Sequence, residues 1–151
     1  MNRKLKILFV CGGNTCRSPM AASVAGVLLG GQADVSSAGV EAWGQRASPK
    51  AIALMQRRYR VDLSSHRSTD LEHVHLDDFD FIVSMEARFA KRLAEQFNVP
   101  IDKIVIWNIR DPAVEDTEAA YESCLSDIER LLPRVLKAML PSNKVKESDV
   151  C

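Results

Sequence analysis

Apolar positions near the start of the chain form a short continuous run and then change to helical spacing. Residues 6–10 are almost entirely apolar and end at a pair of glycines, which is typical of a buried parallel strand. Apolar residues recur at helical spacing over residues 20–28, and we expect Ser18 to cap this helix with Pro19 at its first helical position. The pattern therefore predicts a strand, a tight loop and a helix in succession.

The same alternation of strand-like and helical segments continues along the chain. The predicted strands span residues 35–40, 79–83 and 103–107, and the predicted helices start at Ser48-Pro49, near residue 86 and near residue 117. Pro133 lies within the last helix, which should kink or split there because proline removes a backbone donor. Four strands alternating with helices predict the α/β fold class: a single domain with a four-stranded parallel sheet, right-handed crossovers and helices on both faces.

The length and composition agree with one domain. The chain has 151 residues, and 46% of them are hydrophobic, which is enough for one core without a metal ion or a disulfide. We place the domain over residues 1–140 and expect the polar and charged residues 141–151 to form a disordered tail.

Charge and targeting signals limit the classes of function. Twenty basic and twenty acidic residues cancel, which argues against a broad surface for nucleic acid or membrane and leaves anion binding to a local arrangement of groups. The apolar run behind the basic first residues is too short for a signal peptide or a membrane span. We therefore expect a cytoplasmic protein.

The cysteines are not spaced as metal ligands. Their positions are Cys11, Cys16, Cys124 and Cys151, and the chain has neither a Cys-x-x-Cys pair nor a His-x3-His pair of the kind that binds zinc. In a cytoplasmic chain of this size the expected state is the free thiol. The sequence predicts no metal ion and no other cofactor.

The loop between the first strand and the first helix carries the most informative residues, Cys11-Gly12-Gly13-Asn14-Thr15-Cys16-Arg17-Ser18. Glycine and asparagine tolerate left-handed backbone angles, so the loop can curl and direct its N–H groups at one centre. Such a nest, with the positive end of the following helix, binds a phosphate-sized dianion. Arg17 adds a planar donor pair suited to two phosphate oxygens. The positive field favours the thiolate form of Cys11, which is a competent nucleophile.

Phosphoryl transfer needs an attacking atom in line with phosphorus, donors around the equatorial oxygens and an acid for the leaving oxygen. Cys11 can supply the first of these, and the loop amides with Arg17 can supply the second. Asp111 is the candidate acid, because Asp111-Pro112 follows the fourth predicted strand and a loop there lies beyond the same edge of the sheet. An Asp-Pro pair is also a common way to open a turn, and the proline keeps Asp111 extended.

These residues resemble those of the low-molecular-weight protein tyrosine phosphatase family. The resemblance rests on the loop from Cys11 to Pro19, on Ser37-Ala38-Gly39 and on Asp111-Pro112, and it covers residues 4–140. It implies a cysteinyl-phosphate intermediate, Arg17 as the phosphate binder, and Asp111 as the acid for the leaving group and then the base for water. It also implies a phosphorylated protein as substrate and inorganic phosphate, sulfate or vanadate as a ligand or inhibitor.

The resemblance implies supporting roles for further residues. The loop support consists of Asn14, Ser18, Ser37 and His66. Within it, Ser18 would donate a hydrogen bond to the Cys11 sulfur, and Asn14 would adopt a strained left-handed conformation. Trp43 matches an aromatic residue that lines the mouth of the site. Taken alone, His66 would be an ordinary loop histidine and Trp43 a partly buried aromatic residue.

Two departures from the family pattern bear on the substrate. Ala113-Val114-Glu115 follows the Asp-Pro pair, where members that act on phosphotyrosine carry one or two aromatic residues. Thr15 lies where those members have a bulky apolar residue and the related bacterial protein-arginine phosphatases have threonine. We expect phosphotyrosine as the substrate, with phosphoarginine as the alternative. An arsenate reductase, which would need further redox cysteines, and a non-catalytic phosphate-binding module are the remaining alternatives.

Cys16 has two interpretations. It is either a small apolar residue under the loop or a resolving thiol that traps a sulfenic acid on Cys11 as a reversible disulfide. Cys124 lies on the apolar face of the last predicted helix and is expected in the core.

Overall fold

The structure is a computed structural model that describes residues 4–139. In chain order its strands and main helices are β1 (Leu5–Cys11), α1 (Arg17–Leu29), β2 (Ala33–Gly39), α2 (Pro49–Tyr59), β3 (Phe81–Ser84), α3 (Ala87–Gln96), β4 (Ile104–Ile106) and α4 (Glu118–Met139). Short 3-10 segments lie between them at Gly30–Gln32, Leu71–His73, Leu76–Asp78 and Ile101–Lys103.

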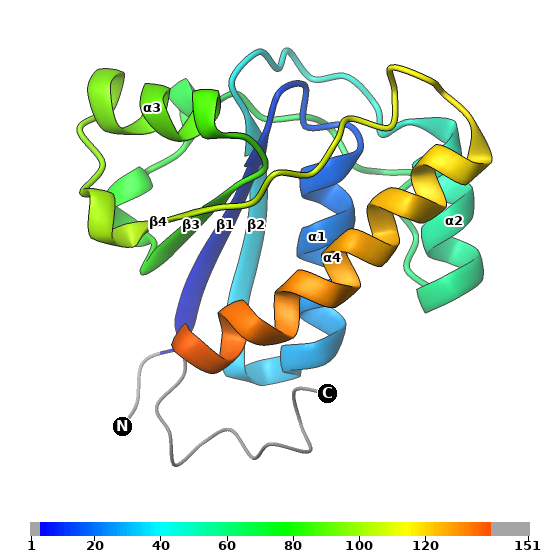
Figure 1. The fold of residues 1–151 in the computed structure, drawn as a ribbon, viewed down its shortest axis with the longest axis horizontal. Coiled ribbons are helices and arrows are strands. Elements are labelled where there is room, and N and C mark those ends of the chain that lie inside the picture. Colours follow the sequence, from blue (N-terminus) through cyan, green and yellow to red (C-terminus); the bar gives the residue numbers. More distant parts are fainter. Residues whose placement is uncertain (1–3, 140–151) are drawn as a thin grey trace.

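The strands form one parallel sheet in the order β2-β1-β3-β4. In the interior strand β1, Ile7 pairs with Val35 of β2 and with Phe81 of β3. Residues 7–10 of this strand are fully buried, as a strand covered on both faces requires. The carboxyl ends of parallel strands meet at one edge, so the segments that follow β1, β2, β3 and β4 gather there (Figure 1).

Helices cover both faces of the sheet, as Figure 1 shows. Helix α1 packs against β1 and β2, and α4 packs against α1 and α2 on the same side. Helix α3 lies against β3 and β4 on the other side. The core between these layers is continuous and includes Met20, Leu93 and Leu125, all fully buried. The predicted α/β fold with a four-stranded parallel sheet is confirmed.

Helix α1 begins two residues earlier than its sequence indicates. Cys16 is the N-cap and Arg17 is the first helical residue, so the expectation that Ser18 caps the helix is wrong. The Ser18 hydroxyl is instead within hydrogen-bond distance of the Cys11 sulfur. At α2 the prediction is confirmed, since Ser48 is the N-cap and Pro49 is the first helical residue.

Pro133 does not split the last helix. Helix α4 runs without interruption from Glu118 to Met139, with Pro133 inside it. The helix has buried side chains on both sides of the proline, including Ile128, Leu132 and Leu136. This packing holds the two halves together despite the loss of one backbone hydrogen bond.

The predicted tail, residues 141–151, lies outside the described residues, as does Cys151. The placement of the domain over residues 1–140 stays a prediction. Among residues 4–139, no helix combines the length and the apolar character needed to cross a membrane.

Candidate active site

The phosphate loop, residues 11–18, connects β1 to α1 at the carboxyl edge of the sheet. Its first half is bonded to the chain that leaves β2, where the Glu41 N–H donates to the Gly12 carbonyl at 3.0 Å. Gly39, which pairs with Cys11, must be glycine because a Cβ atom there would lie 2.5 Å from the Gly12 carbonyl oxygen. The end of β2 therefore fixes the start of the loop by close backbone contact.

The curl of the phosphate loop depends on Asn14 rather than on the two glycines. Asn14 has a φ of 58°, the left-handed conformation that the family resemblance implied. Gly12 and Gly13 do not have left-handed φ angles, and a Cβ atom at either position would make only ordinary contacts. The expectation that these glycines supply left-handed backbone is wrong.

Asn14, Ser18 and Cys11 form a buried hydrogen-bond chain that ends on sulfur. The Asn14 Nδ2 group donates to the Ser18 hydroxyl oxygen at 2.8 Å, and that oxygen lies 2.9 Å from the Cys11 Sγ. The Ser18 hydroxyl accepts from Asn14 and has one hydrogen of its own, which can point at the sulfur or at the Ala38 carbonyl, 3.4 Å away; the sulfur contact is the shorter one. The Asn14 N–H also donates to Cys11 Sγ at 3.3 Å. Two donors thus converge on the sulfur, and hydrogen bonds to a thiolate stabilise it.

A second layer of groups holds Asn14 itself. The Asn14 carbonyl lies 2.8 Å from His66 Nε2, and the Asn14 side-chain oxygen accepts from the Thr69 N–H at 2.9 Å. His66 is therefore where the resemblance implied. Ser37 is not, because it pairs with Phe9 two positions before the strand end and forms no hydrogen bond with the loop among the described residues. The segment around Thr69 takes the position that was expected for Ser37.

The loop contains backbone donors without a partner among residues 4–139. The N–H groups of Gly13, Thr15 and Cys16 have no acceptor within the described part of the chain. The N–H groups of Arg17 and Ser18 lie in the first turn of α1, where a helix has no internal acceptor for them. Convergent N–H groups at a helix N-terminus bind a phosphate-sized dianion.

Arg17 is buried, with 3% of its side chain exposed. Its Nη1 donates to a Glu86 carboxylate oxygen at 2.7 Å and to the Ile109 carbonyl at 2.8 Å, and its guanidinium lies 5.7 Å from the centre of the Phe89 ring. These contacts occupy one side of the guanidinium. Within residues 4–139 the Nη2 and Nε atoms donate no hydrogen bond, so they can donate to two oxygens of an anion in the loop.

Glu86 contacts Arg17 in the candidate site, and the sequence did not point to it. Its carboxylate accepts from Arg17 and also from Arg88 Nε at 2.8 Å. Partial burial by itself would raise the pKa of Glu86, but the hydrogen bonds and charges of Arg88 and Arg17 lower it below its usual value. The carboxylate therefore stays ionised and holds Arg17 in place. Its position just after β3, at the carboxyl edge of the sheet, was the available signal.

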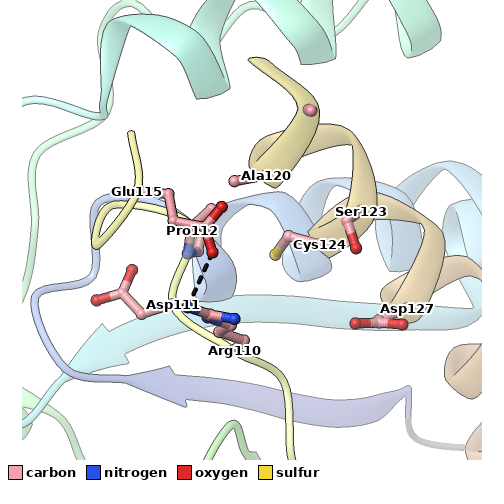
Figure 2. Close-up of a pocket in the computed structure, with 9 residues that line it drawn as sticks. Arg110, Asp111, Pro112, Glu115, Ala120, Ser123, Cys124 and Asp127 are labelled. Atoms are coloured by element: carbon pink, nitrogen blue, oxygen red, sulfur yellow. Dashed lines mark ion pairs between the residues drawn. The ribbon is translucent and has the colours of Figure 1, made fainter. Parts of the chain in front are cut away.

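Asp111 lies across the site from the loop. One carboxylate oxygen is 3.9 Å from Arg17 Nη2, and 40% of the side chain is exposed. The turn that carries it is bonded internally: the Ala113 N–H donates to the other Asp111 oxygen at 3.0 Å, and Arg110 pairs with Glu115 at 2.8 Å. Figure 2 shows the Asp111 carboxylate pointing away from α4. Asp111 was expected at the same edge of the sheet as the phosphate loop, and it lies at that edge beside Arg17.

A cavity of about 210 Å³ lies behind the Asp111 turn. Its lining includes Glu115 of the turn and Ser123, Cys124 and Asp127 of α4, and Figure 2 shows the Cys124 sulfur on the side of α4 that faces the turn. Burial raises the pKa of Cys124 to about 12. Cys124 is thus a core thiol, as expected, and it is not poised to react.

The mouth of the site contains both residues expected in a substrate pocket. Thr15 is half-buried in the loop, and its carbonyl accepts from the Ser48 N–H at 3.0 Å. Trp43 is 78% exposed, so its interpretation as a partly buried aromatic residue is wrong. Its backbone N–H donates to Gln45 at 2.7 Å, and the Gln45 amide nitrogen would lie 3.9 Å from a Cβ atom placed on Gly13. The segment that carries Trp43 therefore reaches the edge of the phosphate loop.

The arrangement places a cysteine sulfur at the base of a loop with unbonded N–H groups, and a carboxylate beside the arginine of that loop. The class of protein that the fold and the loop define is the phosphatases with a cysteine in the phosphate loop. Residues 6–147 match the family "Low molecular weight phosphotyrosine protein phosphatase". The chain belongs to this family, whose members are phosphatases.

Individual relatives carry different activities in their names. A protein-arginine-phosphatase of Geobacillus stearothermophilus is 31% identical over 144 residues, which are 89% of this chain and 95% of the relative. A glutaredoxin arsenate reductase of Synechocystis sp. is 39% identical over 80 residues, but these are only 53% of this chain and 59% of the relative. The solved low molecular weight protein tyrosine phosphatase of T. tengcongensis is 30% identical, with a TM-score of 0.72 over 87% of this chain and 99% of that one.

Proposed function

We propose that this chain hydrolyses phosphotyrosine in proteins through a cysteinyl-phosphate intermediate. The observation that carries the proposal is the convergence of donors on Cys11: the Ser18 hydroxyl oxygen lies 2.9 Å from its sulfur, at the base of a loop lined with unbonded N–H groups. Donors that converge on a cysteine sulfur at a helix N-terminus are the arrangement that a sulfur nucleophile requires. Membership in the phosphatase family supports the same chemistry.

The first chemical step transfers the phosphoryl group to sulfur. The Cys11 thiolate attacks phosphorus, the bond from phosphorus to the leaving oxygen breaks, and Asp111 gives its proton to that oxygen. Arg17 and the loop amides bind the three equatorial oxygens, where charge accumulates. The 3.9 Å separation between Arg17 Nη2 and Asp111 keeps the acid beside the phosphate without a close ion pair.

The second step releases phosphate. Asp111, now a carboxylate, takes a proton from water as the water oxygen attacks phosphorus, and the bond from phosphorus to Cys11 breaks to restore the thiolate. The proposed chemistry needs only residues of the chain and a reduced Cys11, which suits the predicted cytoplasmic location. Phosphate, sulfate and vanadate should compete with the substrate because they fit the same cradle.

The direct test is turnover of a chromogenic aryl phosphate, followed by phosphotyrosine and phosphoarginine peptides assayed side by side. A phosphatase turns over the aryl phosphate, and a non-catalytic phosphate-binding module does not. Trapping a phosphorylated Cys11 in acid-quenched samples identifies the intermediate. Turnover without any phosphorylated cysteine would contradict the covalent mechanism.

Phosphoarginine is a second candidate substrate, and Thr15 is the observation that favours it. The Thr15 hydroxyl can meet the polar N–H groups beside phosphorus in a phosphoguanidinium, whereas a bulky aliphatic side chain would crowd them. The chain also carries the exposed Val114 in place of an aromatic residue after Asp111-Pro112. The similarity to a protein-arginine-phosphatase over almost its whole length supports this candidate.

Arsenate reduction has weaker support, although the Synechocystis relative carries that name. It would require a relay of redox cysteines beyond the phosphate loop. Cys124 is buried, and its pKa of about 12 keeps it a thiol at neutral pH. The relay therefore has no reactive cysteine beyond Cys11 and Cys16 within residues 4–139.

A further inference from the structure

The phenol of Tyr121 lies under the phosphate loop, within a chain of polar groups drawn from three segments. Its oxygen is 2.7 Å from the Ser48 hydroxyl and 3.3 Å from the Cys16 sulfur. The Cys16 sulfur is 3.6 Å from the Thr15 hydroxyl, and the Ser48 N–H donates to the Thr15 carbonyl. Tyr121 and Cys16 are both buried.

The hydrogen bonds that link Cys16, Tyr121 and Ser48 can run in either of two directions. While Cys16 is a thiol, it can donate its hydrogen to Tyr121, which then donates to Ser48. If Cys16 loses its proton, Ser48 can donate to Tyr121, and Tyr121 can donate to the sulfur. Each hydroxyl only has to rotate, and no heavy atom has to move. Tyr121 therefore has a hydrogen bond to offer the Cys16 thiolate, with Ser48 as its own donor.

We propose that Tyr121, with support from Ser48, is a positioning residue that makes Cys16 the resolving thiol for an oxidised Cys11. The inference rests on the proposed function, because it concerns the regulation of the same nucleophile. Without the phenol, the Cys16 thiolate would be buried with only the weak contact to Thr15. Forming that thiolate would then cost more free energy, and the disulfide would form more slowly.

The chemistry needs a peroxide as oxidant. The Cys11 thiolate attacks hydrogen peroxide, the O–O bond breaks, and Cys11 becomes a sulfenic acid with release of hydroxide. The Cys16 thiolate then attacks the Cys11 sulfur, an S–S bond forms, and the S–O bond breaks. The departing hydroxide takes up the proton that Cys16 lost and leaves as water. The two thiols together lose two electrons, and the peroxide is reduced to water.

The surroundings of Cys16 give the step a pH dependence. Burial raises the pKa of Cys16, and the hydrogen bonds from Tyr121 and Thr15 oppose that rise. The titratable groups that interact with Cys16 are Tyr121 and Cys124 of α4, Cys11 of β1 and Asp111 of the turn after β4. Of these, only Tyr121 forms a hydrogen bond with the Cys16 sulfur. Removing its hydroxyl should therefore raise the pKa of Cys16 further.

The test measures how oxidised Cys11 divides between two products. Wild type, Tyr121→Phe, Ser48→Ala and Tyr59→Phe are treated with hydrogen peroxide and quenched with an alkylating reagent. Mass spectrometry then gives the ratio of Cys11–Cys16 disulfide to Cys11 sulfinic acid. Tyr59→Phe is the matched control, because Tyr59 also links α2 to α4 through its hydroxyl, but its partner is Glu129 at 2.5 Å.

The expected result is a ratio about tenfold lower in Tyr121→Phe, from the loss of one hydrogen bond to a charged sulfur. Ser48→Ala should lower the ratio less, and Tyr59→Phe should match wild type. The Tyr121→Phe deficit should shrink as the pH rises through the pKa of Cys16, because both proteins then hold Cys16 as thiolate. A variant that merely loosened the packing would show the same deficit at every pH.

Several outcomes would overturn the proposal: equal ratios in wild type and Tyr121→Phe, a deficit independent of pH, or a wild type that forms no Cys11–Cys16 disulfide. If circular dichroism shows that Tyr121→Phe is unfolded, Ser48→Ala decides, and a ratio equal to wild type overturns the proposal. The readout is the covalent state of the cysteines. Failure of the phosphatase assay is therefore distinguishable from failure of this inference.

Discussion

The strained residue Asn14 offers a sharp test of how the phosphate loop is held. Replacement by alanine or glycine removes the same two side-chain hydrogen bonds: a buried one to Ser18 at 2.8 Å and a partly buried one from Thr69 at 2.9 Å. Each bond contributes about 1 kcal/mol, and the stranded Thr69 N–H adds a desolvation cost of about 1–2 kcal/mol. Both variants should therefore lose about 3–4 kcal/mol in the free energy of unfolding.

The two variants differ in backbone strain. Asn14 has a φ of 58°, where an alanine is disfavoured by about 1–2 kcal/mol and glycine is not. Glycine in turn lowers the stability by about 0.4–1 kcal/mol, because it increases the conformational entropy of the unfolded chain. Asn14→Gly should thus be more stable than Asn14→Ala by about 1 kcal/mol, although it buries less surface.

Urea unfolding at equilibrium measures the difference, provided that the slope with denaturant is the same for all variants. Asn98 is the matched control, since it also has a left-handed φ, of 56°, but no side-chain hydrogen bond within residues 4–139. Asn98→Gly and Asn98→Ala should show the same 1 kcal/mol difference from strain, without the larger common loss. Equal stability of the two Asn14 variants, or both within about 0.5 kcal/mol of wild type, would refute this account of the loop.

Further predictions concern the chemistry. Cys11→Ser should abolish turnover yet bind vanadate, because the loop donors remain, and residual turnover would exclude the covalent mechanism. Arg17→Lys should lower kcat/KM by at least about 100-fold, since one ammonium cannot replace the planar donors; near-normal kinetics would remove Arg17 from the site. Asp111→Asn should slow poor leaving groups by roughly 10²–10⁴-fold and activated aryl phosphates less, with Asp116→Asn as the control from the same turn. Thr15→Ile should shift the activity ratio from phosphoarginine toward phosphotyrosine peptides, and an unchanged ratio would refute its role in specificity.

The sequence predicted those parts of the molecule that depend on local pattern. A few neighbouring positions are enough to predict the buried run of β1, the helix that begins at Pro49 and the residues of the phosphate loop. The order of the strands cannot be predicted in this way, because it depends on which helix crosses which face of the sheet. Pro133 shows the limit of local rules, since tertiary packing on both sides of it keeps α4 continuous.

The residues that the sequence did not reveal act through contacts between distant segments. Glu86 contacts Arg17 across 69 positions and Tyr121 contacts Cys16 across 105. No spacing along the chain signals such a pair, and Tyr121 fits the apolar face of its helix well enough to hide its hydroxyl. The expectation for Ser37 was wrong for a different reason. Ser37 lies in the stretch that was expected to support the loop, but it pairs with Phe9 within the sheet, and Thr69 contacts Asn14 instead.

The position of Arg17 shows why the phosphate loop needs the whole sheet. The Cys-x5-Arg spacing places Arg17 at the start of α1, but three other groups set the direction of its guanidinium: the Glu86 carboxylate after β3, and the Ile109 carbonyl and Asp111 after β4. An arginine side chain has several freely rotating bonds, and fixing them costs up to about 2 kcal/mol. The groups at the carboxyl ends of β3 and β4 fix the Arg17 side chain before an anion binds. The entropy is therefore lost on folding and not on binding. The phosphate affinity that we propose should therefore depend on the parallel sheet, through the edge at which its strands end, as much as on the loop sequence.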